Sequence, residues 1–204
     1  MRTVMRLTCL VLFVLCGMTT ASGKATDKVN WKASWISSGT TKEKPNTWLN
    51  YRKTVNLPNV PTSVIAKIAA DSKYWLWING ELVVFEGGVK RGPNPLDTYY
   101  DEVEIAPYLK RGENTIAVLL WYFGRPSFAH NDSGKAGLLF DCQTVTFDIL
   151  SDDTWKCEAN PAFGTCSPPD PNMRLAESNI RYDARKEYLT WYKPGFNDAY
   201  MPQA

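Results

Sequence analysis

A hairpin signal constrains the possible fold of this chain more than any other feature of its sequence. In the run "KYWLWINGELVVFEGG" (73–88), one Asn-Gly pair separates two stretches rich in large apolar residues. A two-residue type I′ turn requires positive φ at both central positions, which Asn79 and Gly80 adopt readily. The run therefore predicts two antiparallel strands joined by a tight turn. The expected cross-strand pairs are Ile78 with Glu81, Trp77 with Leu82, Leu76 with Val83, and Trp75 with Val84.

These strands carry apolar side chains on both faces, because side chains alternate along a strand. One face is expected to carry Trp75, Trp77, Leu82 and Val84, and the other Tyr74, Leu76, Ile78, Val83 and Phe85. In the run 114–123, Ile116, Val118, Leu120 and Tyr122 share one face, and Ala117, Leu119, Trp121 and Phe123 share its reverse. A two-layer sandwich buries only one face of each sheet. The second face must therefore be covered by the C-terminal part of the chain or by another domain.

Short strands separated by turn residues continue through most of the chain. The 204 residues include 8 Trp, 10 Tyr and 8 Phe with 13 Gly and 13 Pro, which favours strands over helices. The other expected strands are 33–37, 47–57, 63–70, 98–106, 114–123, 135–142, 143–150 and 154–157, with one helical or 3₁₀ turn within 105–114. This spacing is typical of an all-β sandwich. The net charge of +2 gives no support for a nucleic-acid partner.

The two ends of the chain differ from this pattern. Two arginines precede a short apolar run (7–18) that is followed by small residues, which predicts a signal peptide over 1–22 and a polar linker over 23–30. We therefore expect a secreted or periplasmic protein without a membrane partner after cleavage, with an uncleaved anchor as the alternative. The sandwich is expected over 31–157. Residues 158–204 form a Pro-rich loop and a C-terminal extension too short to bury a core alone.

Three cysteines follow the expected signal peptide. Cys157 and Cys166 bracket a short Pro-containing loop and are the favoured disulfide pair, since export permits a disulfide. Cys142 would then be a free thiol within a strand. The odd count also allows that no disulfide forms.

Several segments resemble one family of sugar-cleaving enzymes. They are "LWINGELVVFEGG" (76–88), "YYDEVEIAPYLKRGENTIAVLLWYFG" (99–124), "DTWK" (153–156), "YDAR" (182–185) and "PGFNDA" (194–199). Together they are similar to the N-terminal, galactose-binding-like jelly-roll region of bacterial alpha-L-rhamnosidases, family seventy-eight of the glycoside hydrolases. The sequence departs from the family pattern at Asn197, Ala199 and Met201, where Asp, Ser and Trp are usual.

This resemblance implies a jelly-roll β-sandwich with an irregular C-terminal extension, truncated before a catalytic (α/α)₆ barrel. The expected function is that of an accessory module of an alpha-L-rhamnosidase-like enzyme acting on plant-type or other complex polysaccharides. Its expected partner is a rhamnose-containing glycan or the barrel domain. Two alternatives stay open: a free-standing carbohydrate-binding protein, and an accessory domain of a family-two-like beta-glycosidase.

No catalytic residue, metal site or cofactor is expected in this chain. Glycoside hydrolysis needs two carboxyl groups that flank the bond. Asp101, Glu102 and Glu104 are candidates only because they supply enough carboxyl groups. His130 is the single histidine, and no Cys-x-x-Cys pair supports a metal site. No phosphate-binding loop or dinucleotide fingerprint is present.

Six residues remain candidates for contact with carbohydrate or with a neighbouring domain: Trp75, Trp77, Arg91, Trp121, His130 and Asn131. Tryptophans can stack on sugars, but the apolar neighbours of Trp75 and Trp77 favour packing. His130 lies in a polar loop (127–137) and is either a loop contact or a packing histidine, which we favour because no partner is visible. Arg91 lies in a long loop (86–101) that is either a binding loop or a solvated connection.

Overall fold

The computed structural model describes residues 29–39, 44–89, 94, 97–128, 130–165 and 175–204. Trp31–Ala204 forms one structural unit, and Met1–Asn30 is a separate one. The predicted signal peptide and most of the predicted linker lie outside the described residues. Within the described ranges, no helix is both long and apolar enough to cross a membrane.

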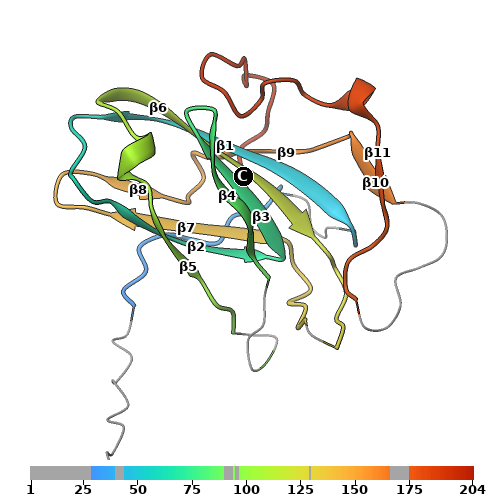
Figure 1. The fold of residues 1–204 in the computed structure, drawn as a ribbon. Coiled ribbons are helices and arrows are strands. Elements are labelled where there is room, and N and C mark those ends of the chain that lie inside the picture. The colour runs from blue at the N-terminus through green and yellow to red at the C-terminus, as the bar shows by residue number, and fades with distance from the viewer. Residues whose placement is uncertain (1–28, 40–43, 90–93, 95–96, 129, 166–174) are drawn as a thin grey trace, which may run out of the picture. The chain divides into compact units, whose positions relative to one another are not determined.

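Two antiparallel sheets build the sandwich (Figure 1). The first has the strand order β4-β3-β6-β1-β9, with β1 at Thr47–Leu57, β3 at Lys73–Ile78, β4 at Glu81–Gly88, β6 at Gly112–Tyr122 and β9 at Lys156–Ala159. The second has the order β5-β2-β7-β8, with β2 at Ile65–Asp71, β5 at Asp101–Glu104, β7 at Gly137–Gln143 and β8 at Asp148–Leu150. The remaining elements are the pair β10 (Phe163–Thr165) and β11 (Ile180–Tyr182) and the 3₁₀ turns η1 (Ala106–Tyr108) and η2 (Ala184–Lys186). The predicted galactose-binding-like jelly-roll sandwich is confirmed.

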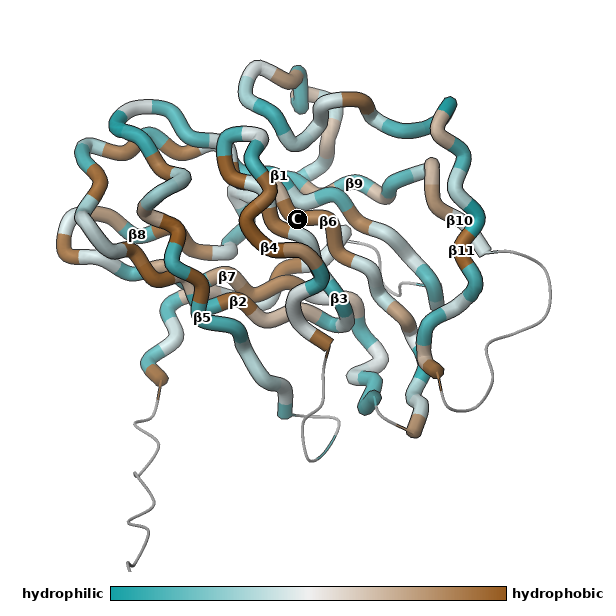
Figure 2. Tube along the Cα trace, in the orientation of Figure 1, coloured by the Kyte–Doolittle hydropathy of each residue, from teal (hydrophilic) through white to brown (hydrophobic). Residues whose placement is uncertain are grey.

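A hydrophobic core fills the space between the two sheets. The first sheet contributes Leu49, Tyr51, Tyr74, Leu76, Ile78, Ile116, Val118 and Leu120, and the second contributes Ala66, Ile68, Ala70, Leu138, Phe140, Cys142 and Ile149. Figure 2 shows the strongly hydrophobic stretches lying along the strands. The predicted inward face of β6 is confirmed, since all four of its residues belong to this core.

The predicted hairpin is present, and its turn has the expected backbone. Asn79 and Gly80 have φ of 54° and 88°, the left-handed region that a type I′ turn requires. Next to the turn, the predicted pairs Ile78–Glu81 and Trp77–Leu82 are confirmed.

Farther from the turn, irregularities in β4 shift the pairing. Leu76 pairs with Val84 and Tyr74 with Gly87, so β4 contains extra residues relative to β3. The predicted pair Leu76–Val83 is therefore wrong, and so is the predicted partner of Trp75. Strict alternation assumed a ladder without bulges, whereas each bulge adds a residue to one strand.

The same bulges change which face of the sheet two side chains of β4 occupy. Val84 packs against the core between the sheets instead of lying beside the tryptophans. Phe85, predicted on the core face, instead contacts Trp75 edge-on at 6.3 Å between ring centroids. Leu82 is 45% exposed. The predicted apolar face on the tryptophan side of the sheet is thus formed by the tryptophans of β3 and by β6, and β4 contributes little to it.

Some predicted strands are shorter or displaced. Residues 33–37 form only an isolated bridge, Ile36 with Leu138. The strand predicted at 143–150 is limited to β8, because Thr144 and Phe147 close a turn through a hydrogen bond of 3.0 Å. The strand predicted at 154–157 begins and ends two residues later, as β9. The predicted helical or 3₁₀ turn is confirmed as η1.

Candidate functional site

The outer face of the first sheet is covered by the chain's own C-terminal extension. The buried residues of this outer aromatic cluster are Trp48, Ala117, Leu119, Trp121, Phe123, Ala176 and Trp191. Figure 1 shows the extension lying along this sheet, on the side away from β2 and β7. The predicted reverse face of β6 is confirmed, since all four of its residues belong to this cluster. The strands that carry apolar residues on both faces are therefore covered on their outer face by the chain's own extension.

The tryptophans proposed as a sugar platform lie within this covered face. Trp77 contacts the rings of Trp191 and Tyr192, at 5.7 and 5.3 Å between centroids. Trp75 is half-buried and stacks on Trp48 at 5.6 Å. Trp121 is only 5% exposed. Sugar stacking needs an open ring face, so these three residues serve packing in this structure.

A buried arginine fastens the extension to the sandwich. Arg52 of β1 is 2% exposed, and its Nε donates to Asp198 Oδ2 at 2.8 Å. Its Nη1 donates to the carbonyl groups of Trp191 and Lys193 at 2.9 and 3.0 Å. Asp198 also accepts from Lys156 Nζ at 2.7 Å. Although burial raises the pKa of the Asp198 carboxyl, hydrogen bonds from Lys156 and Arg52 bring it below its usual value.

The tail of the extension continues this attachment through its backbone. The Cys157 amide donates to the Pro202 carbonyl at 2.9 Å, and the Ala204 amide donates to the Trp155 carbonyl at 2.8 Å. The free edge of β9 is thereby covered, as a sheet edge commonly is in stable proteins. The PGFNDA segment that carried part of the family resemblance thus has a clear structural role in this chain.

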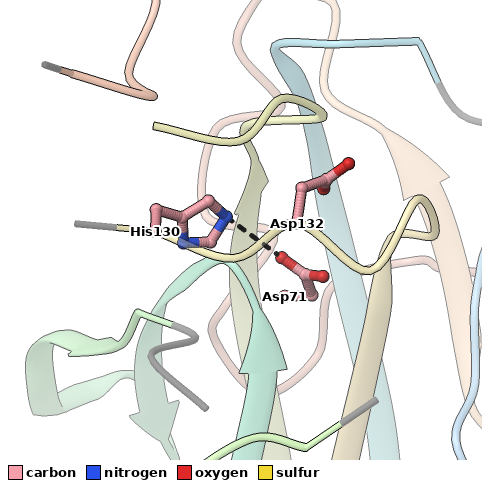
Figure 3. A group of neighbouring side chains, drawn as sticks. All are labelled: Asp71, His130 and Asp132. Carbon is pink, nitrogen blue, oxygen red and sulfur yellow. Dashed lines mark ion pairs between the residues drawn. The ribbon is translucent and has the colours of Figure 1, made fainter. Parts of the chain in front are cut away.

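The single histidine lies in a buried polar group at one end of the sandwich. His130, Asp71 and Asp132 form this acid–imidazole cluster, and Figure 3 shows the His130 ring facing Asp71. Asp71 ends β2, and the other two residues lie in the loop between β6 and β7. One ligand-type atom from each residue lies within 4.8 Å of the other two. Asp71 and His130 are only 3% and 4% exposed.

Hydrogen bonds hold Asp71 firmly in this cluster. Its Oδ1 accepts from Ser72 Oγ at 2.8 Å, and its Oδ2 accepts from the amide and the hydroxyl of Ser133. His130 Nε2 lies 3.7 Å from Asp71 Oδ1 and 3.4 Å from Ser72 Oγ. Burial and the nearby charge of Asp71 raise the pKa of Asp132. The cluster therefore brings two carboxylates and an imidazole together, a donor set suited to a cation.

Two of the other carboxylates named from the sequence, Asp101 and Glu104, have structural partners. Asp101 Oδ2 accepts from the Tyr74 hydroxyl at 2.8 Å and from the Gly88 amide at 2.9 Å. Glu104 Oε1 accepts from the Val64 amide at 2.8 Å. Both carboxylates thus join β5 to neighbouring segments.

The remaining predicted residues fall into two groups. Arg91 and Cys166 lie outside the described residues, so the Arg91 contact and the Cys157–Cys166 disulfide stay predictions. Asn131 is half-buried beside the acid–imidazole cluster. Cys142 is buried in β7 as a free thiol, as predicted.

An aromatic cavity that the sequence did not predict lies over the outer face of the second sheet. Its volume is about 340 Å³, and it is lined by Trp31, Ala33, Trp35, Ala69, Thr98, Tyr100 and Leu139. Trp35 is 50% exposed and Tyr100 is 37% exposed. Trp31 and Tyr100 meet edge-on at 5.2 Å between centroids. The only sequence signal was the density of aromatic residues near position 31 and near position 100.

Comparison with known proteins finds a similar fold in one part of several glycosidases. A rhamnosidase of glycoside hydrolase family 78 from Bacillus sp. GL1 is 31% identical with a TM-score of 0.77, over 86% of this chain and 18% of that chain. The alpha-L-rhamnosidase from Dictyoglumus thermophilum is 21% identical with a TM-score of 0.63, over 85% of this chain and 21% of that one. The alpha-L-rhamnosidase from Aspergillus terreus is 23% identical with a TM-score of 0.62, over 84% of this chain and 21% of that one. No family model and no curated protein match the sequence.

The chain spans only about a fifth of the length of these enzymes. The two matches below 25% identity support the fold, whereas the Bacillus enzyme adds similarity of sequence. The resemblance expected from the hairpin and from the C-terminal motifs is confirmed: this chain is a galactose-binding-like β-sandwich similar to one module of the family 78 alpha-L-rhamnosidases.

Proposed function

We propose that this chain is a non-catalytic accessory module of an alpha-L-rhamnosidase-like glycoside hydrolase that is exported and acts on plant-type or other complex polysaccharides. The observation that carries the proposal is the 31% identical match to the Bacillus enzyme, which covers 86% of this chain but 18% of that enzyme. Export rests on the predicted signal peptide over 1–22 and is tested by N-terminal sequencing of the mature protein.

The carboxylates of the chain support a role without catalysis. Hydrolysis requires two carboxyl groups about 5–5.5 Å apart in retaining enzymes and about 6.5–9.5 Å apart in inverting enzymes, on either side of the sugar bond. Asp71 and Asp132 bring one carboxylate oxygen each within 4.8 Å of the other, but Asp71 is only 3% exposed and both of its oxygens accept hydrogen bonds from Ser72 and Ser133. Asp71 is therefore not placed to act on a sugar bond.

The outer surface of the extension supports contact with a neighbouring catalytic domain. Its exposed large apolar residues are Leu175, Ile180, Tyr182, Leu189 and Tyr200. These residues come from one stretch of chain, 175–200, and a contiguous apolar surface is typical of interfaces between domains. In the proposed role, the inner side of the extension packs on the sandwich and its outer side meets the barrel.

A chimera tests the proposal. Residues 31–204 would replace the matching segment of the Bacillus rhamnosidase, and hydrolysis of an aryl alpha-L-rhamnoside would be compared with that of the native enzyme and of a deletion lacking the segment. An accessory module is expected to restore soluble, active enzyme where the deletion does not. A chimera as defective as the deletion contradicts the proposal.

A second candidate function, direct carbohydrate binding, is favoured by the aromatic cavity around Trp35. Open aromatic rings can stack on the C–H faces of sugars. Titration against a panel of rhamnose-containing glycans would compare Trp35→Ala with Trp77→Ala. Binding that is lost only in Trp35→Ala supports this function. Binding lost only in Trp77→Ala, or no binding by the wild type, contradicts it.

A further inference from the structure

The acid–imidazole cluster carries an arrangement that structural packing alone does not explain. His130 Nδ1 and Asp132 Oδ1 are buried and have no hydrogen-bond partner among the described residues. A buried polar atom without a partner costs on the order of 1–3 kcal/mol. Asp132 Oδ1 is the atom that a partner bound inside the cluster would satisfy, because the His130 nitrogen that faces Asp71 is Nε2 and not Nδ1.

The contacts of His130 Nε2 point to the same conclusion. The hydroxyl of Ser72 donates to Asp71 at 2.8 Å and accepts from the Phe123 amide at 3.2 Å. Its single proton is therefore already used, and it cannot donate to the histidine 3.4 Å away. In the tautomer that carries its proton on Nδ1, the Nε2 lone pair faces the Asp71 carboxylate at 3.7 Å, which is repulsive, and a cation between the two atoms would bind both.

Among the described residues, the charge partner of the cluster's carboxylates is His130, which is positive only when its ring is protonated. Two carboxylates lie close together, and no lysine or arginine of the described residues forms an ion pair with Asp71 or Asp132. A bound cation would neutralise the carboxylates and accept the imidazole lone pair in one step.

We propose that Asp71, His130 and Asp132 bind a divalent transition-metal ion, with zinc as the best fit. Imidazole nitrogen combined with carboxylate oxygen suits Zn²⁺, whereas Ca²⁺ takes oxygen ligands almost alone. Ligand atoms around a tetrahedral zinc are about 3.3 Å apart, given bonds of about 2.0 Å. The Nε2–Oδ1 separation of 3.7 Å needs only a small contraction to reach this geometry.

The metal has a structural consequence for the module. Asp71 ends β2, and the other two ligands lie in the loop between β6 and β7. A metal bound at this point therefore joins the end of the second sheet to a long loop at one end of the sandwich. Metal binding of this kind adds to the free energy of unfolding, because the unfolded chain has no preformed site.

The test uses the purified chain without a polyhistidine tag, freed of metal by a chelator that is then removed. Zinc chloride and calcium chloride are titrated separately by calorimetry, and thermal unfolding is measured at each end point. We expect one zinc ion per chain, a higher melting temperature with zinc, and weaker binding of calcium. No binding of zinc, or tighter binding of calcium than of zinc, overturns the proposal.

Variants and NMR assign the site to these residues. Asp132→Asn changes a half-buried loop residue, so the fold should survive, and Glu113→Gln is the matched control at the far end of β6. Loss of a metal ligand in Asp132→Asn should weaken zinc binding by more than the roughly 10–100-fold that is typical when a residue hydrogen-bonded to a ligand is mutated.

NMR assigns the histidine ligand. His130 is the single histidine, so its ring resonances are identified without ambiguity. They should shift until one equivalent of zinc is bound, and unchanged ring resonances, or equal affinity in Asp132→Asn, contradict the assignment.

Discussion

Truncation of one side chain in the extension, Trp191→Ala, tests whether the extension and the sandwich form one cooperative unit. Trp191 is 4% exposed and packs against Trp77, so the change removes an aromatic ring from the centre of the outer aromatic cluster. The carbonyl group of Trp191, which accepts from Arg52, stays in place. The variant therefore probes packing and leaves the hydrogen bonds of the backbone intact.

The expected cost follows from the area that the ring buries. A buried tryptophan hides about 200 Å², which at about 25 cal/mol per Å² corresponds to about 5 kcal/mol. Truncations of large aromatic residues in protein cores cost about 3–5 kcal/mol. We therefore expect the free energy of unfolding to fall by about 3–5 kcal/mol, with a single transition at lower urea concentration.

Urea unfolding followed by circular dichroism measures this change. The matched control is Leu189→Ala, on the same extension but 74% exposed, which should change the free energy of unfolding by less than about 0.5 kcal/mol. A loss below about 1 kcal/mol in Trp191→Ala, or two separate transitions in the wild type, would refute the view that the extension is part of the sandwich.

Three further predictions follow from single side chains. Asp198→Asn should lower the free energy of unfolding by about 3 kcal/mol at pH 7. Because the pKa of Asp198 is depressed in the folded state, its contribution is fully present above the unfolded-state pKa of about 4 and is lost progressively as the pH falls through the folded-state pKa, so the difference in unfolding free energy between wild type and variant should be smaller at pH 3 than at pH 7. Burial, and then nearby carboxylates, raise the pKa of Cys142 to about 12, so a thiol reagent at pH 8 should modify it only at the rate of unfolding; fast modification contradicts its burial. Gly87→Ala should cost about 1–3 kcal/mol because the new Cβ collides with the Tyr74 ring, whereas Gly164→Ala, whose Cβ meets only Arg181 at 3.6 Å, should be nearly neutral; equal melting temperatures would count against this packing.

The sequence predicted the parts of the fold that local rules determine. Asn79 and Gly80 specify the turn, and the alternation in β6 assigned each of its apolar residues to the correct face. The same rule failed in β4, because bulges near Val83 and Glu86 depend on contacts with the rest of the sheet. Alternation describes a regular ladder and contains no information on where the ladder is interrupted.

The candidate site was much less accessible to sequence reasoning. His130 was noticed, but its partner Asp71 lies 59 positions earlier at the end of a different strand. Nothing in the spacing of these residues links them, since only the crossing of the chain between the sheets brings them together. The one signal for this cluster in the sequence was Asp71, a charged residue directly after the apolar run 64–70. The aromatic cavity was missed for the same reason, because Trp35 and Tyr100 come from distant segments.

The central claim, that this is an accessory module without catalytic activity, is tested most directly by hydrolysis of an aryl alpha-L-rhamnoside by the purified chain alone. A complete family 78 rhamnosidase serves as the positive control, and Asp71→Asn and Asp132→Asn serve as variants of the clustered carboxylates. The account predicts no release of the aryl group above the buffer blank by the chain or by either variant. Turnover by the chain that disappears in one of these variants would contradict it.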